Sequence, residues 1–272
     1  MGSIEFLRQL EKEGVKEFPD FVQGRNELAI FFLHGFGSSP EESAIFLKYL
    51  ANKGYTISAP VIKDCSHNND LEKINNASPD DWLAEVEQHY KFLAEKPEIK
   101  KIVIIGLSFG GNLAISLAAT DPEKLAGVVT LETPVFFSRK ISLGLRFVRP
   151  LLLLFKIQFI NKTSRLYRRG YKESKMKDVI PLIPLRVVGK IFNFVNKRTK
   201  TDIKKLKQAF LGVQAKKSDL VNPKSVEYLY RQAPASVKNI FYLSVNNHDL
   251  SLLDEQGKML MMERVEKFIE SL

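Results

Sequence analysis

Cysteine and histidine are scarce in this chain of 272 residues, and long apolar runs are missing. The single cysteine, Cys65, excludes an internal disulfide and a cysteine-rich metal site. The four histidines are scattered without metal-ligand spacing, so we expect no metal and no cofactor. The longest apolar run is far shorter than the roughly 18–20 residues of a membrane-spanning helix, so we do not expect the chain to span a membrane.

The first residues also lack the apolar core of a secretory signal peptide, because charged side chains interrupt them, and Phe6 departs from the myristoylation pattern. Together with the single cysteine, this start predicts a cytoplasmic protein. The chain is 44% hydrophobic, enough for a large core in one α/β domain or in a domain with an insertion. Disorder is not expected at this composition.

The net charge of +10 is unevenly distributed along the chain. Residues 136–207 contain 20 Lys and Arg but only 3 Asp and Glu, a net charge of +17. The remaining residues contain 21 Lys and Arg and 28 Asp and Glu, a net charge of −7. Such a difference in charge indicates that the basic segment is an insertion.

Outside the basic segment, apolar runs typical of buried strands alternate with helical patterns. Strict alternation predicts an α/β fold with a mostly parallel sheet and helices on both faces. We therefore assign residues 1–135 and 205–272 to the core, and residues 136–204 to a basic helical cap insertion. The expected strands are 28–33, 55–59, 101–106, 125–131, 208–213 and 239–245. The expected helices are 38–53, 78–95, 109–120, 223–232 and 254–271. We also expect a short helix at 3–13, an edge strand at 18–23 and a loop at 60–78.

One stretch has the pattern of a nucleophile elbow. The residues Gly106-Leu-Ser108-Phe-Gly110 lie between an expected buried strand and an expected helix. A serine at such a sharp turn is lifted above the sheet edge, and flanking glycines leave room for the turn. The helix N-terminus can then stabilise an oxyanion that develops beside the serine. We expect Ser108 to be a nucleophile.

A serine nucleophile needs a base and a carboxylate that orients the base. Asp219 lies in the loop after strand 208–213, and His248 lies in the loop after strand 239–245. Because the carboxyl ends of parallel strands gather at one edge of a sheet, these side chains are expected on the same side as Ser108. The chain order Ser, Asp, His also fits this type of site.

Other interpretations remain open. Glu132, at the end of strand 125–131, competes with Asp219 as the acid. Asp219 could also be an ordinary loop carboxylate, and His248 a solvated loop histidine. A reading with Cys65 as nucleophile has no helix behind it. Of the other histidines, we expect His34 to shape the loop after strand 28–33, His67 to be a solvated loop residue and His89 to lie at or near the surface.

The elbow is one of several motifs that occur in a fixed order: His34-Gly35-Phe36-Gly37, Gly54-Tyr55-Thr56 with Ala59-Pro60, Asp80-Asp81-Trp82, Gly106-Leu-Ser108-Phe-Gly110-Gly111, Val213-Gln-Ala with Asp219 and Asn222-Pro223, and His248. In these motifs, over about residues 28–135 and 208–272, the chain resembles the α/β-hydrolases, and among them small bacterial carboxylesterases and monoacylglycerol lipases. The resemblance implies an α/β-hydrolase fold with Ser108 as nucleophile, His248 as general base and Asp219 as orienting acid. It also implies an oxyanion hole formed by the backbone N–H groups of Phe36 and Phe109.

The chain departs from that family at residues 63–70, which lack the usual glycine-containing turn, and at Asn247, where a small residue is usual. The basic cap also differs from the acidic or mixed caps of such relatives. We expect the cap, 136–204, to contact an anionic membrane surface, which would place a cytoplasmic protein at the inner membrane face. The alternative is a solvated surface without a partner, and the lack of a recognition motif argues against nucleic acid.

These observations predict a serine hydrolase that cleaves carboxylic esters, with monoacylglycerols or other medium to long acyl esters as substrates. A non-catalytic lipid-binding protein of the same fold is the alternative from another class. A serine peptidase is a third reading.

Overall fold

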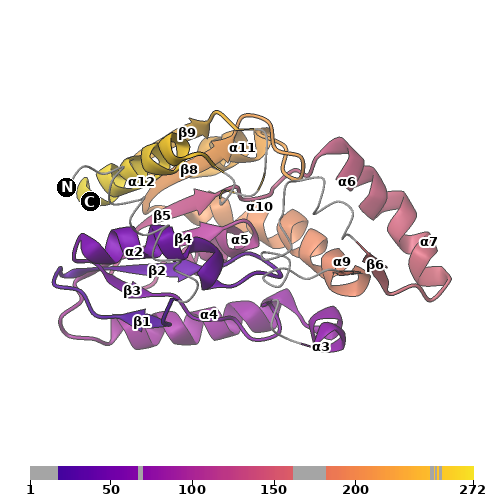
Figure 1. Cartoon of the computed structure of the whole chain (residues 1–272), viewed down its shortest axis with the longest axis horizontal. Coiled ribbons are helices and arrows are strands. Elements are labelled where there is room, and N and C mark those ends of the chain that lie inside the picture. The colour runs from indigo at the N-terminus through magenta and orange to yellow at the C-terminus, as the bar shows by residue number, and fades with distance from the viewer. Residues whose placement is uncertain (1–17, 67–69, 162–181, 246–247, 249, 251–252) are drawn as a thin grey trace.

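The computed structural model describes residues 18–66, 70–161, 182–245, 248, 250 and 253–272 (Figure 1). A seven-stranded sheet with the order β1-β3-β2-β4-β5-β8-β9 forms its centre. β1 pairs with β3 in antiparallel orientation, and every other adjacent pair is parallel. The strands are β1 Phe21–Val22, β2 Leu28–Leu33, β3 Thr56–Ser58, β4 Lys101–Leu107, β5 Leu125–Leu131, β8 Ala209–Ala215 and β9 Lys238–Leu243. This confirms the predicted α/β fold with a mostly parallel sheet.

Helices cover both faces of the sheet because successive strand residues point to opposite faces. Phe31 and Phe32 are both fully buried, yet they belong to two different core clusters. One cluster packs the sheet against α4, α5 and α11, and the other packs it against α2 and α12. The helices are η1 Pro40–Ser43, α2 Ala44–Asn52, α4 Pro79–Ala94, α5 Phe109–Ala118, α11 Lys224–Gln232 and α12 Glu255–Glu270.

The ends of these elements follow the local capping chemistry. Before α4, the Ser78 hydroxyl accepts the Asp80 N–H, and Pro79 fills the first helical position, where no N–H is needed. Gly54 follows α2 with a φ of +92°, which favours glycine. The predicted helix at 3–13 lies outside the described residues.

The expected loop at 60–78 is wrong in part, because it contains the helix α3, Leu71–Asn76. The Asp70 carboxylate caps this helix by accepting the N–H groups of Glu72 and Lys73. The Asn75 side chain is buried and bonds Gln158 and the Arg186 N–H. A helix of six residues is too short to be stable alone, so long-range contacts, including the full burial of Ile74 in the core, stabilise it.

The segment between β5 and β8 forms a helical lobe beyond the carboxyl ends of the strands (Figure 1). Its inner part packs into the core, since Val187, Ile191, Phe194 and Ile203 belong to the same cluster as α4 and α5. Within the described ranges, no helix is long and apolar enough to cross a bilayer. The division at 136 and 204 stays a prediction. The lobe contains α6 Arg139–Leu143, η2 Gly144–Val148, α7 Arg149–Leu154, β6 Phe159–Asn161, β7 Leu182–Pro184, α9 Leu185–Phe194, η4 Val195–Thr199, α10 Lys200–Asp202 and η5 Ile203–Lys205.

Candidate active site

Ser108 lies at a strained turn between β4 and α5. Its φ of 50° and ψ of −118° fall in a region that residues with a side chain rarely adopt, at a cost of about 1–3 kcal/mol. The neighbouring glycines make the turn sterically feasible. A Cβ on Gly110 would lie 2.2 Å from the Leu33 carbonyl oxygen, and one on Gly106 would lie 2.4 Å from the Gly111 Cα. The sequence therefore builds a turn that exposes the serine hydroxyl at the sheet edge.

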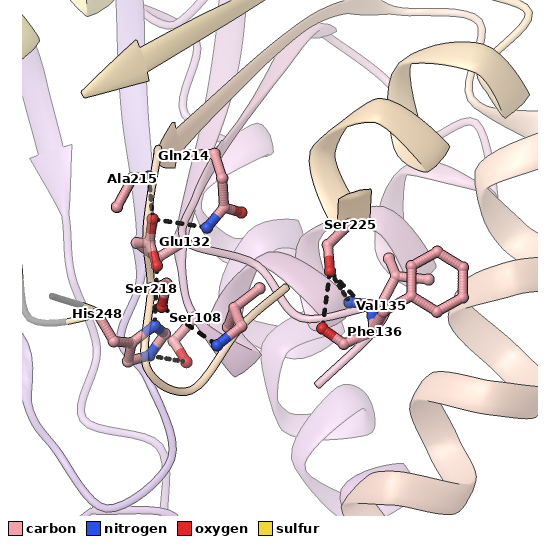
Figure 2. Close-up of polar contacts among 10 residues, drawn as sticks. Ser108, Glu132, Val135, Phe136, Gln214, Ala215, Ser218, Ser225 and His248 are labelled. Atoms are coloured by element: carbon pink, nitrogen blue, oxygen red, sulfur yellow. Dashed lines mark hydrogen bonds and ion pairs between the residues drawn. The ribbon is translucent and has the colours of Figure 1, made fainter. Parts of the chain in front are cut away.

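His248 connects Ser108 to a carboxylate (Figure 2). The His248 Nε2 is 2.9 Å from the Ser108 Oγ, and its Nδ1 is 3.1 Å from the Glu132 Oε2. An ionised carboxylate only accepts hydrogen bonds, so it holds the imidazole proton on Nδ1. Nε2 is then free of a proton and can accept the proton of the serine hydroxyl.

Glu132 is fully buried at the end of β5, with a φ of 52°. Its backbone N–H donates to the Val213 carbonyl of β8 over 2.9 Å. Its Oε1 accepts the Gln214 Nε2, at 2.7 Å, and the Ala215 N–H (Figure 2). These two donors stabilise the carboxylate in place of water and turn its second oxygen toward His248.

The expectation for Asp219 needs correction, because Glu132 holds the position beside His248. Asp219 lies in an exposed turn beyond the end of β8. The residues after it are drawn toward the lobe, since the Ser138 N–H donates to the Leu220 carbonyl and the Asn222 N–H donates to the Phe136 carbonyl. This long-range pairing cannot be read from local sequence. The sequence offered Glu132 as the competing acid, whereas Gln214 appeared only within the Val213-Gln-Ala motif, without a role of its own.

The loop after β2 approaches the serine from the opposite side. A Cβ on Gly35 would lie 3.3 Å from the Ser108 Cβ. The Gly35 carbonyl accepts the Ser38 hydroxyl at 3.2 Å and the Ser38 N–H at 3.3 Å. In a trans peptide the C=O and the following N–H point in opposite directions. The Phe36 N–H is therefore directed away from these donors.

His34 fixes this loop and is fully buried. Its Nε2 accepts the Ile62 N–H at 2.9 Å, so the ring proton is on Nδ1, which donates to the Gly35 carbonyl at 2.8 Å. Both nitrogens are engaged, as expected for a residue that shapes the loop. On the other side, the Phe109 N–H is at the first position of α5, where a helix offers no internal acceptor.

A row of aromatic rings joins this region to the lobe. Phe36 contacts Trp82 with ring centroids 5.8 Å apart, Trp82 contacts Phe109 at 5.7 Å, and Phe109 contacts Phe194 of α9 at 5.6 Å. The last three rings are at least 95% buried. The row therefore continues the core from the loop beside Ser108 to α9, and Phe36 is its partly exposed end.

A separate cavity of about 360 Å³ lies where the chain after β5 meets α9 and the start of α11. The Ser225 hydroxyl holds one wall by accepting the N–H groups of Val135 and Phe136 and donating to the Phe136 carbonyl (Figure 2). Ser108, Glu132 and His248 are not among the lining residues. The cavity is lined by Val135, Phe136, Phe137, Ser142, Phe192, Asn196, Asn222 and Lys224.

The other sequence candidates lie apart from this chemistry. Cys65 is fully buried, and burial raises the pKa of its thiol, which keeps it protonated and unreactive. His89 lies 3.8 Å from Glu85 at the surface of α4. His67 is outside the described residues. In the part of the chain that the structure describes, no group of three His, Cys, Asp or Glu side chains could hold a metal.

Comparison with known proteins gives one relative that matches most of the chain and another that matches less than half of it. A carboxylesterase of Bacillus subtilis is 23% identical over 256 residues, which cover 90% of this chain and 93% of the relative. A thermostable monoacylglycerol lipase of Bacillus sp. is 30% identical over 115 residues, 42% of this chain and 44% of the relative. The shorter match is the more similar one.

Solved structures share the fold. A structure from a study of LipS and LipT, two metagenome-derived lipolytic enzymes, has a TM-score of 0.76 and 21% identity, with 93% of this chain and 96% of that chain covered. The monoacylglycerol lipase of Paleococcus ferrophilus has a TM-score of 0.67 and 15% identity, with coverage of 93% and 99%. Residues 24–256 match the family Hydrolase_4, described as serine aminopeptidase, S33. With this match over most of its length, the chain belongs to the Hydrolase_4 family of α/β-hydrolases.

Proposed function

We propose that the protein is a serine hydrolase that cleaves carboxylic esters through an acyl-enzyme. In this proposal Ser108 is the nucleophile, His248 the general base and Glu132 the orienting acid. The observation that carries it is the bridge that His248 forms between the Ser108 hydroxyl, at 2.9 Å, and the Glu132 carboxylate, at 3.1 Å. The strained backbone of Ser108 supports it, because such strain persists at functional sites.

The reaction then follows from the geometry. Ser108 Oγ attacks the ester carbonyl carbon while its proton moves to His248 Nε2, and buried Glu132 stabilises the imidazolium that forms. The N–H groups of Phe36 and Phe109 are proposed to bind the oxyanion of the tetrahedral intermediate. The intermediate collapses, the C–O bond to the alcohol breaks, and His248 returns the proton to the leaving alkoxide. Water then attacks the acyl-enzyme by the same route and releases the acid.

Medium to long acyl esters, with monoacylglycerols among them, are the proposed substrates. Phe36 is partly exposed in the loop that approaches Ser108, and its ring can offer an apolar surface to an acyl chain. Relatives named as a carboxylesterase and a monoacylglycerol lipase support this class. Peptide hydrolysis is the second candidate, because the family description names a serine aminopeptidase. A cytoplasmic location remains part of the proposal.

Fluorophosphonate labelling combined with p-nitrophenyl esters of increasing chain length tests the proposal. Wild type should label and hydrolyse esters, whereas Ser108→Ala should not label and should lose about four or more powers of ten in kcat. Aminoacyl p-nitroanilides tested in parallel identify a peptidase. If wild type neither labels nor turns over any ester or anilide, the enzyme reading fails in favour of a non-catalytic lipid-binding protein.

A further inference from the structure

The outer helices of the lobe carry large apolar side chains on their solvent-facing side. Among the described residues, seven of the eleven exposed large hydrophobic side chains fall between residues 143 and 157. On the continuous run of α6, η2 and α7, four of them (Leu143, Phe147, Leu151 and Leu154) recur at intervals of three or four residues, which places these four on one side of a helix. Val148 lies next to Phe147, and Phe155 and Ile157 follow the end of α7. The seven are Leu143, Phe147, Val148, Leu151, Leu154, Phe155 and Ile157, and we call them the outer stripe.

The side of these helices opposite the outer stripe is held to the lobe by hydrogen bonds. Arg149 Nε donates to the Leu185 carbonyl at 2.7 Å and so joins α7 to α9. The Ser142 hydroxyl donates to the Phe137 carbonyl at 3.2 Å. Leu152 and Leu153 are only partly exposed, in contrast with Leu154, which is 75% exposed. Leu143, Phe147 and Leu154 therefore face outward, at the end of the molecule far from the C-terminus (Figure 1).

Cations surround the outer stripe, and residues 133–161 contain no Asp or Glu. Arg139, Lys140, Arg146 and Lys156 are exposed. Within the described residues none of the four pairs with a carboxylate, and Arg146 lies over the Phe147 ring at 5.4 Å. An apolar row with flanking unpaired cations is the pattern of a helix that lies in the interface of an anionic bilayer.

A second copy of the chain is a less suitable occupant. Two copies that paired through the outer stripe would bring together two segments, residues 139–157 of each copy, that each contain five Lys and Arg and no Asp or Glu. A bilayer with anionic headgroups supplies both the opposite charge and an apolar layer, since polybasic segments gain about 1 kcal/mol per Lys or Arg near such a surface. Charge complementarity therefore favours lipid.

We propose that residues 139–157 dock the protein on membranes that contain anionic lipids, with the outer stripe between the headgroups and the four exposed cations against the phosphates. The inference concerns where the proposed hydrolase meets its substrate, but binding does not depend on the chemistry at Ser108. Docking through α6 and α7 would turn the carboxyl ends of the strands toward the membrane, with the rest of the lobe between them and the bilayer (Figure 1).

Vesicle sedimentation tests the docking. Wild type and Ser108→Ala should bind phosphatidylcholine vesicles with 30% phosphatidylglycerol equally well, and at least tenfold more tightly than pure phosphatidylcholine. The triple variant Phe147→Ser, Leu154→Ser, Phe155→Ser should lose at least tenfold in binding to the anionic vesicles while its turnover of p-nitrophenyl acetate stays unchanged. Phe92→Ser is the matched control, because Phe92 is 64% exposed on α4, outside the stripe, and should bind as wild type does.

A fluorescence measurement keeps the test independent of any folding defect in the triple variant. The single native tryptophan, Trp82, is 1% exposed, so a tryptophan introduced at an exposed site reports its own surroundings. Leu154→Trp should shift its emission to the blue and be quenched by brominated lipid with anionic vesicles, whereas Phe92→Trp should not.

Three outcomes overturn the proposal: equal binding to both kinds of vesicle, absence of binding, or binding that the triple variant retains. A dimer in light scattering that the triple variant abolishes would assign the outer stripe to a second copy instead. If vesicles bind but no ester is cleaved, the docking stands and the proposed catalytic function fails.

Discussion

The carboxyl edge of the sheet buries a charged side chain, whereas the outer helices of the lobe expose apolar side chains to solvent. At the edge, a carboxylate is fully buried, and hydrogen bonds from Gln214, Ala215 and His248 replace its water. On α6 and α7, Phe155 and Leu154 are about three-quarters exposed. Buried polar and exposed apolar groups are the informative exceptions in a folded protein. We propose that the buried carboxylate serves catalysis within the fold and that the exposed apolar side chains bind a partner outside it.

The largest expected effect separates the two carboxylates near the sheet edge. Glu132→Gln should lower kcat on p-nitrophenyl esters by about three to four powers of ten, because an amide can hold the wrong histidine tautomer. Asp219→Asn, the matched control, should retain activity within about threefold. Steady-state kinetics on both variants decide the matter. A severe loss in Asp219→Asn with an active Glu132→Gln would restore Asp219 as the acid.

The next effect compares two phenylalanines of the lobe. Phe194 is 5% exposed and contacts Phe109, whereas Phe155 is 73% exposed. Phe194→Ala should lower the free energy of unfolding by about 3–5 kcal/mol, and Phe155→Ala should change it by less than about 0.5 kcal/mol. Urea unfolding followed by circular dichroism measures both. A similar loss of stability in the two variants would show that the Phe155 side chain is packed against the protein rather than exposed to solvent.

Two glycines allow the same comparison for the backbone. A Cβ on Gly110 would lie 2.2 Å from the Leu33 carbonyl oxygen, whereas a Cβ on Gly144 in η2 meets nothing within 4 Å. Gly110→Ala should destabilise by about 2–3 kcal/mol through strain at the elbow. Gly144→Ala should raise the free energy of unfolding by about 0.5–1 kcal/mol, because alanine loses less backbone conformational entropy than glycine when the helix forms. Thermal unfolding would contradict the model of the elbow if Gly110→Ala melted at the wild-type temperature.

The smallest expected effect tests how the outer helices are attached. Arg149→Met keeps the apolar stem but removes the Nε donor to the Leu185 carbonyl. It should cost about 1 kcal/mol of stability, the net value of one hydrogen bond. Turnover of a short soluble ester should stay at the wild-type level, since Arg149 lies outside the catalytic set. A fall in turnover on that substrate would show that the lobe positions the sheet edge.

Local patterns were sufficient for most of the fold. The strand at 125–131 was predicted at its observed bounds, and α4, predicted at 78–95, lies at 79–94 because Ser78 and Pro79 set its start. α3 was missed because its six residues are too few to show a helical period, and its stability depends on the Asp70 cap and on distant partners. The sequence also named Ser108 and His248, which the structure brings within hydrogen-bond distance, and their catalytic roles are part of our proposal.

The sequence by itself determined the alternation of strands and helices, the glycine-lined turn at Ser108 and the concentration of positive charge in one segment, because each depends on neighbouring residues. Only the tertiary structure decided which carboxylate faces His248. That choice depends on the contact of Glu132 with β8 and on the pairing of residues 220–222 with residues 136–138. The tertiary structure likewise divided the basic segment into α9, which packs into the core, and α6 and α7, which do not, since burial depends on the surfaces that meet in the fold.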